Sequence, residues 1–168
     1  MTVALAPAPD ISRRRITLRI ALAFVALLEM VNGLHAVALA INHMPDAAPL
    51  FGFLMKARFM TNVALALGAL GLAASGYVRS AIVALALIFV MTLLVGLPFL
   101  LAGGFTGSVK VAIFTQPHFL AFPMMAAIAA LLAFRNRWLW LATVLLAIPS
   151  AYSMFWIVML AGVLIGRQ

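Results

Sequence analysis

Five long apolar runs account for most of the chain, and they decide what kind of fold it can form. They cover residues 20–41, 59–78, 81–102, 111–134 and 138–165. Each run holds about 20 to 28 residues, enough for a helix rising 1.5 Å per residue to cross the ~30 Å hydrocarbon core of a bilayer. The pattern therefore predicts a chain that crosses a membrane several times.

The composition excludes a water-soluble protein. Hydrophobic residues make up 67% of the 168 residues and charged residues only 8%, against roughly 45–50% and about 25% in a soluble domain. So few charges cannot cover the surface of a soluble enzyme, and the apolar content is far too high for a disordered chain. The absence of cysteine also excludes disulfides, thiolate metal sites and thiol redox chemistry.

The links between the runs predict how the helices are arranged. Only Arg79-Ser80 separates the second run from the third, and only residues 135–137 separate the fourth from the fifth. Links this short force neighbouring helices to be antiparallel. We therefore predict an all-α fold, a polytopic integral membrane bundle of five transmembrane helices.

This bundle is expected to form a single domain over residues 16–168, after a flexible cytoplasmic arm at residues 1–15. Four helices are the alternative, because Pro117 and Pro123 interrupt the first half of the fourth run. Between the first two runs we expect a short outer loop whose apolar stretch, residues 50–55, lies in the membrane interface.

Small residues in the second run predict a face for close helix approach. Ala64 and Gly68 lie four residues apart, as do Gly71 and Ser75. Such pairs let two helix backbones come together in a membrane.

The excess of positive charge indicates the orientation of the chain. The net charge of +8 comes from 11 Lys and Arg against 3 Asp and Glu. In a soluble protein this balance would suggest nucleic acid, but here the cations flank the apolar runs, so no nucleic-acid partner is expected. A cytoplasmic N-terminus places seven cations inside, namely Arg13, Arg14, Arg15, Arg19, Arg79, Arg135 and Arg137. It leaves four outside, namely Lys56, Arg58, Lys110 and Arg167.

We therefore expect the lipid bilayer as the main partner, with the inner (plasma) membrane of a bacterium as the location. A charged segment before an apolar run also occurs in signal peptides. Glu29 and Asn32 within this run argue against that alternative, because both are poor residues for a signal core.

The first run has a polar face. Glu29 is the only acidic residue within a predicted span and lies roughly 13 Å past the inner boundary, near the midplane. At about 100° per residue, Asn32, His35, Asn42 and His43 fall with Glu29 in an arc of about 140°. A charge at the centre of a bilayer costs about 2.5–3.5 kcal/mol on insertion scales. We therefore expect this face to turn toward the bundle interior or a cavity.

Three further helices bring polar groups to a similar depth in the outer third of the membrane. If these groups face one another, they line a pocket that opens to the outer side, with Glu29 at its floor. The predicted ligand- or proton-binding residues are Glu29, Asn32, His35, Asn62, Gln116, His118 and Tyr152.

Each polar group also has a structural interpretation. Glu29 can be protonated and hydrogen-bonded to Asn32, and a membrane histidine is often only an interhelical hydrogen bonder. Arg58 can extend to the membrane surface, with Asn62 one helical turn away holding it in place.

Three classes of function fit these features. The first is binding, and in one version transport, of a small molecule or ion, with Glu29 as a proton site and His35 as a relay. A transporter this short would have to form a homo-oligomer. The second is a redox subunit, with His35 and His118 ligating haem iron or with a quinone site. The third is an accessory or assembly subunit of a larger membrane complex.

The sequence favours a protein that is not an enzyme. It contains neither H-E-x-x-H nor G-x-S-x-G, and the loops are too short to build a hydrolytic site. Binding without a resident cofactor is the simplest expectation, with haem or quinone as the alternative.

One stretch resembles a known family. The resemblance lies in Leu18-Arg19-Ile20-Ala21-Leu22, in the histidine near the end of the first helix, and in the proline-containing outer loop. It continues in Leu70-Gly71-Leu72 before the turn Tyr77-Val78-Arg79-Ser80. Over about the first 85 residues these features resemble DoxX-like small membrane proteins. The resemblance implies a four-helix bundle and a redox-linked or undefined role, and it assigns no functional residue.

Overall fold

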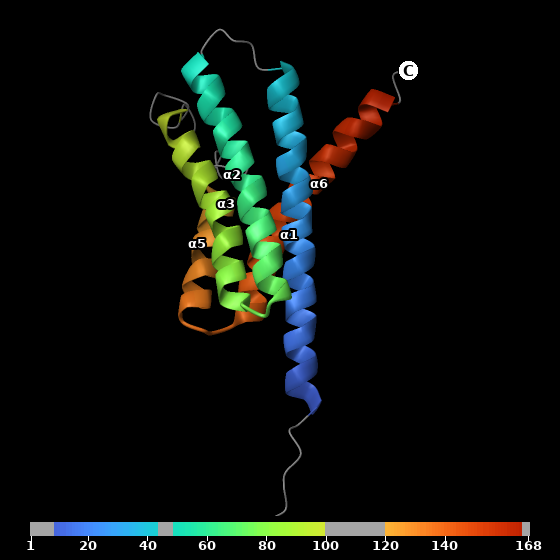
Figure 1. The fold of residues 1–168 in the computed structure, drawn as a ribbon, viewed down its shortest axis with the longest axis vertical. Helices are drawn as coiled ribbons and strands as arrows, with labels where there is room; N and C mark the ends of the chain where they lie inside the picture. The colour runs from blue at the N-terminus through green and yellow to red at the C-terminus, as the bar shows by residue number, and fades with distance from the viewer. Residues whose placement is uncertain (1–8, 44–48, 100–119, 166–168) are drawn as a thin grey trace, which may run out of the picture.

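The computed structural model describes residues 9–43, 49–99 and 120–165, and all regular structure in these ranges is α-helical. The helices are α1 (Pro9–His43), α2 (Pro49–Ala74), α3 (Val78–Phe99), α5 (Ala121–Phe134) and α6 (Leu139–Ile165). They pack as one bundle in which successive helices run in opposite directions (Figure 1). The all-α prediction is confirmed for this part of the chain.

Two tight turns reverse the chain at the same end of the bundle (Figure 1). In the turn after α2, Tyr77 N–H donates to the Leu72 carbonyl at 2.8 Å and Gly76 N–H donates to the Ala73 carbonyl at 3.1 Å. Gly76 has a φ of 87°, which glycine adopts without the steric cost that a Cβ brings. The turn after α5 repeats this pattern around Asn136, whose φ is 51°.

The same end of the bundle holds the arginines predicted to lie on one side of a membrane. Arg19 of α1 donates from Nε to the Ala73 carbonyl at 3.1 Å and from Nη2 to the Ala74 carbonyl. These bonds fasten α1 to the end of α2, where carbonyls have no partner within the helix. The other arginines at this end are Arg13, Arg14, Arg15, Arg79, Arg135 and Arg137.

Each helix buries a stripe of residues spaced three or four apart, and small side chains dominate two of these stripes. On α2 the buried residues are Asn62, Ala66, Ala69 and Ala73, and on α5 they include Phe122, Ala126, Ala129 and Ala133. Alanine lets the backbones come close together. The small residues noted in the sequence, Ala64, Gly68, Gly71 and Ser75, are all exposed, so they make no close helix contact among the described residues, and their use between chains stays a prediction.

Large apolar side chains cover the outside of the bundle. Phe24 is 60% exposed and Phe134 is 72% exposed, far more than a water-soluble protein of this size tolerates over so many positions. Among the described residues, three helical segments are long and apolar enough to cross a membrane: Arg13–Leu39, Lys56–Ala74 and Leu139–Met159. The apolar stretches Val78–Leu94 and Ala121–Phe134 are shorter.

The helix boundaries differ from the expected ones at two places. α1 already begins at Pro9, so residues 9–15 are helical rather than a flexible arm. α2 begins at Pro49 and continues without a break, so residues 50–55 do not form a separate interfacial segment. Proline suits both starts because it has no N–H, and the N–H groups of the first helical turn have no carbonyl partner within the helix. Most of the first half of the predicted fourth span lies outside the described residues.

Candidate ligand-binding pocket

A cavity of about 440 Å³ lies in the half of the bundle that is remote from the two tight turns. All five described helices contribute to its lining. The C-terminal half of α6, which supplies part of that lining, leans away from the other helices (Figure 1). The polar and charged lining residues are Glu29, Asn32, His35, Arg58, Asn62, Thr92 and Ser153. The apolar walls include Phe59, Ile88, Phe89, Phe122, Trp156 and Ile157.

Glu29 lies at the inner end of this cavity. Its side chain is only 5% exposed, and Asn32 Nδ2 donates to Glu29 Oε1 at 3.3 Å. The fully buried Ser150 hydroxyl lies next to the Glu29 carboxyl group. The same hydroxyl donates to the Leu146 carbonyl at 2.9 Å. Because the hydroxyl has one proton, Ser150 can donate either to Leu146 or to Glu29; when it donates to Leu146, its oxygen can still accept a hydrogen bond from a protonated Glu29.

The packing around Glu29 explains why the cavity ends there. Ala26 and Leu22 lie one and two turns from Glu29 on the same face of α1, toward the end of the bundle with the two tight turns. Both are fully buried, so the bundle is tightly packed on that side of the carboxyl group. One turn outward, Gly33 lies against Val63 of α2, with only 2.8 Å between its ideal Cβ position and Val63 Cγ2. The apolar core thus gives way to the polar cavity within about two helical turns.

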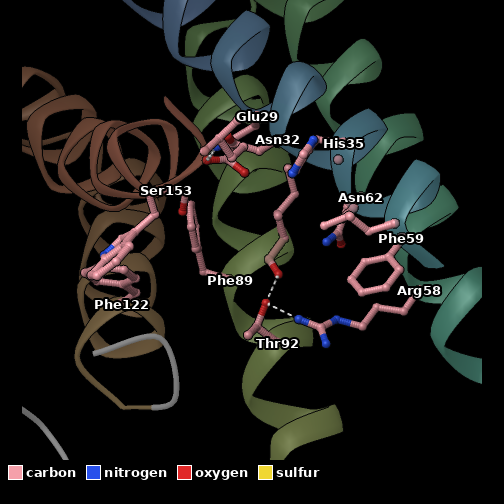
Figure 2. A pocket seen from close by; sticks show the side chains of 16 residues that line it. Glu29, Asn32, His35, Arg58, Phe59, Asn62, Phe89, Thr92, Phe122 and Ser153 are labelled. Atoms are coloured by element: carbon pink, nitrogen blue, oxygen red, sulfur yellow. Dashed lines mark hydrogen bonds between the residues drawn. The ribbon is translucent and has the colours of Figure 1, made fainter. Parts of the chain in front are cut away.

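Arg58 of α2 forms the other end of the polar lining. Its Nη2 donates to Thr92 Oγ1 of α3 at 2.9 Å, and Thr92 Oγ1 donates to the Ile88 carbonyl at 3.1 Å. Figure 2 shows the guanidinium reaching across the cavity toward Thr92. The side-chain hydrogen bond of Arg58 is thus to another helix and not to Asn62, and its extension to the membrane surface stays a prediction.

Three polar atoms around the cavity are buried and have no hydrogen-bond partner among the described residues. They are Asn32 Oδ1, Asn62 Oδ1 and Arg58 Nε. Each such atom costs about 1–3 kcal/mol when left unpaired, and native proteins satisfy nearly all of them. Asn62 is only 9% exposed, so bulk water does not hydrogen-bond to its Oδ1 in this conformation. The residues of all three atoms line the cavity, so a bound molecule can supply the missing partners once these side chains turn toward it.

The structure brings four of the predicted site residues to one cavity. Glu29, Asn32, His35 and Asn62 all contribute to the lining, as Figure 2 shows. Tyr152 is half-buried behind it, with its ring 5.3 Å from the Phe122 ring in an edge-to-face contact.

The remaining predicted site residues, Gln116 and His118, lie outside the described residues. The haem pair of His35 and His118 therefore stays a prediction. Within the described ranges there is no group of three or more His, Cys, Asp or Glu side chains that could hold a metal ion.

Several lining residues were missed from the sequence. Arg58 was assigned to the surface because it lies near the end of an apolar run, although Asn62 follows it by one turn on the same helix face. Thr92 and Ser153 are hydroxyl side chains in largely apolar helices, and such residues usually bond to their own backbone. Only the arrangement of the helices places them in the same cavity as Arg58 and Glu29.

No family model, characterised protein or solved structure matches the chain. The resemblance to DoxX-like membrane proteins stays a prediction, and the site has to be interpreted from its own chemistry.

Proposed function

We propose that the chain is a small integral membrane protein that binds a small polar molecule in the cavity between its helices. The observation that supports this most strongly is the group of three buried polar atoms without partners, two acceptors and one donor, around one cavity. A protein whose role is only structural gains nothing from leaving these atoms unpaired, because each is costly in a nonpolar environment.

Membrane insertion is supported by three apolar helices of sufficient length and by the apolar exterior. In the proposed topology all five helices cross, and α5 is the inner part of the fourth crossing. The end with the two tight turns and the seven arginines faces the cytoplasm, since short cytoplasmic segments are enriched in arginine and lysine. The cavity, in the opposite half of the bundle, then opens toward the outer side.

Cysteine labelling tests this proposal, and the natural chain has no cysteine to interfere. Asn62→Cys places a thiol in the cavity, Ser80→Cys places one at the arginine-rich end, and Ala69→Cys places one in the packed core. We expect a membrane-impermeant thiosulfonate reagent to label Asn62→Cys from the outside and Ser80→Cys only from the inside. Ala69→Cys should resist labelling from both sides, because its side chain is fully buried.

An Asn62→Cys thiol as unreactive as the Ala69→Cys thiol would contradict an outward-facing polar pocket. Labelling of Asn62→Cys from the cytoplasmic side alone would contradict the orientation. The labelling results require that the three cysteine variants insert into the membrane as the natural chain does. Resistance of each variant to extraction from the membrane by alkaline carbonate checks its insertion.

A further inference from the structure

The cavity has opposite chemical character at its two ends. Glu29 and Asn32 lie together at one end, and Arg58 with Thr92 lies at the other, with Asn62, His35 and Phe89 between them (Figure 2). Arg58 has no carboxylate partner among the described residues, and Glu29 has only the Asn32 amide and the Ser150 hydroxyl. A bound molecule can therefore meet an acid at one end and a guanidinium at the other.

The two ends are too far apart to form an ion pair with each other. α1 and α2 run antiparallel, and Gly33 of α1 lies directly against Val63 of α2. Glu29 lies four residues from this contact toward the end of the bundle with the two tight turns. Arg58 lies five residues from it in the opposite direction, so the two separations add. Nine residues correspond to roughly 13 Å along the helix axes, so an elongated molecule is needed to contact both charges.

Each end of the cavity has an unpaired atom that needs the same kind of partner as the charge beside it. Asn32 uses its Nδ2 to donate to Glu29, which fixes Oδ1 as the free acceptor next to the acid. Asn62 Oδ1 is a second free acceptor further along the cavity, whereas Arg58 Nε is a free donor at the far end. The inner end is therefore completed by a hydrogen-bond donor, best a cation, and the outer end by an acceptor, best an anion.

The walls define what can lie between the two end groups. Phe89 and Phe122 are nearly fully buried core residues, and they line the cavity together with Ile88 and Trp156. Such a surface binds a hydrocarbon or aromatic segment through apolar contact. The volume of about 440 Å³ lies in the range typical of small-molecule sites.

On these grounds we infer that the pocket takes a dipolar molecule, with an ammonium group at Glu29 and Asn32 and a carboxylate or phosphate at Arg58, joined by an apolar segment. This inference rests on the proposed binding function. A free ω-amino acid, whose ammonium and carboxylate groups are separated by several methylene groups, supplies this chemistry.

Matched probes test this inference on the purified full chain in nanodiscs made of phosphatidylglycerol. ε-Aminocaproate carries both end groups, caproate lacks the ammonium, and hexylamine lacks the carboxylate. We expect ε-aminocaproate to bind at least about tenfold more tightly than either single-ended probe, because only it pairs both charges. Glycerophosphoethanolamine, tested in parallel, is the short control: its ammonium and phosphate groups are only two methylene groups apart, so we expect it to bind more weakly than ε-aminocaproate.

Two variants assign the end groups. Glu29→Gln should remove the preference for ε-aminocaproate over caproate, and Arg58→Gln should remove its preference over hexylamine. Equal affinity of the natural chain for all three linear probes would overturn the inference without relying on any variant. If Asn62→Cys is nevertheless labelled from the outside, the proposed pocket stands and only its ligand class is wrong.

Discussion

Replacement of Glu29 by methionine is expected to make the detergent-solubilised protein more stable and to remove its affinity for a dipolar ligand. The side chain is 5% exposed, and its polar neighbours among the described residues, Asn32 and Ser150, are neutral, so burying it costs free energy that a flexible apolar side chain of similar length avoids. We expect the free energy of unfolding to rise by about 1–2 kcal/mol, typical of substitutions that relieve a site kept for function. Thermal unfolding of the purified chain, followed by circular dichroism, measures the change.

Leu22→Met is the matched control for this substitution. Leu22 lies two turns inward on the same face of α1 and is fully buried, so methionine there is a nearly volume-conserving change that costs less than about 1.5 kcal/mol. A Glu29→Met protein that unfolds more easily than both the natural chain and Leu22→Met would show that Glu29 holds the bundle together. The alternative interpretation of Glu29 as a structural hydrogen bonder would then be correct.

Gly33→Val is expected to destabilise the outer half of the bundle. Even the first added carbon would lie 2.8 Å from Val63 Cγ2 and 3.5 Å from Val63 N. Val63 cannot easily turn away, because a β-branched side chain in a helix has one strongly preferred rotamer. α1 and α2 must therefore separate, and we expect the free energy of unfolding to fall by about 1–3 kcal/mol.

Two comparisons make this expectation specific. Val63→Ala removes the clashing methyl groups, so the double variant Gly33→Val with Val63→Ala should recover part of the loss. Gly68→Val is the control on α2, because nothing lies within 4 Å of its ideal Cβ position. Equal losses from Gly33→Val and Gly68→Val would contradict the close contact between α1 and α2.

The sequence predicted those parts of the fold that depend on local chemistry. Apolar runs of sufficient length predicted helices, and Asn136 lies in a link that was predicted to reverse the chain. The boundaries were harder, because Pro9 and Pro49 permit a helix to start without requiring one. The exposed Gly68 shows a further limit: small residues permit a close approach, but which small residues are used depends on how the helices are rotated.

The site was predictable on one helix and less so on the others. Glu29, Asn32 and His35 share a face of α1, which helical periodicity alone reveals. The contact between Arg58 and Thr92 joins residues 34 positions apart, and no periodicity within one helix can show it. The direction of the Arg58 side chain could not be predicted from the sequence either, because an arginine near the end of a span can point to the membrane surface or across the bundle.

An experimental density map of the full chain, extracted from its own membrane with native lipid, tests the central claim most directly. We predict a discrete feature that is not part of the chain, within hydrogen-bonding distance of Asn32 Oδ1, Asn62 Oδ1 and Arg58 Nε. A cavity closed by apolar packing, with these three atoms bonded to other residues of the chain, would contradict the proposed binding site.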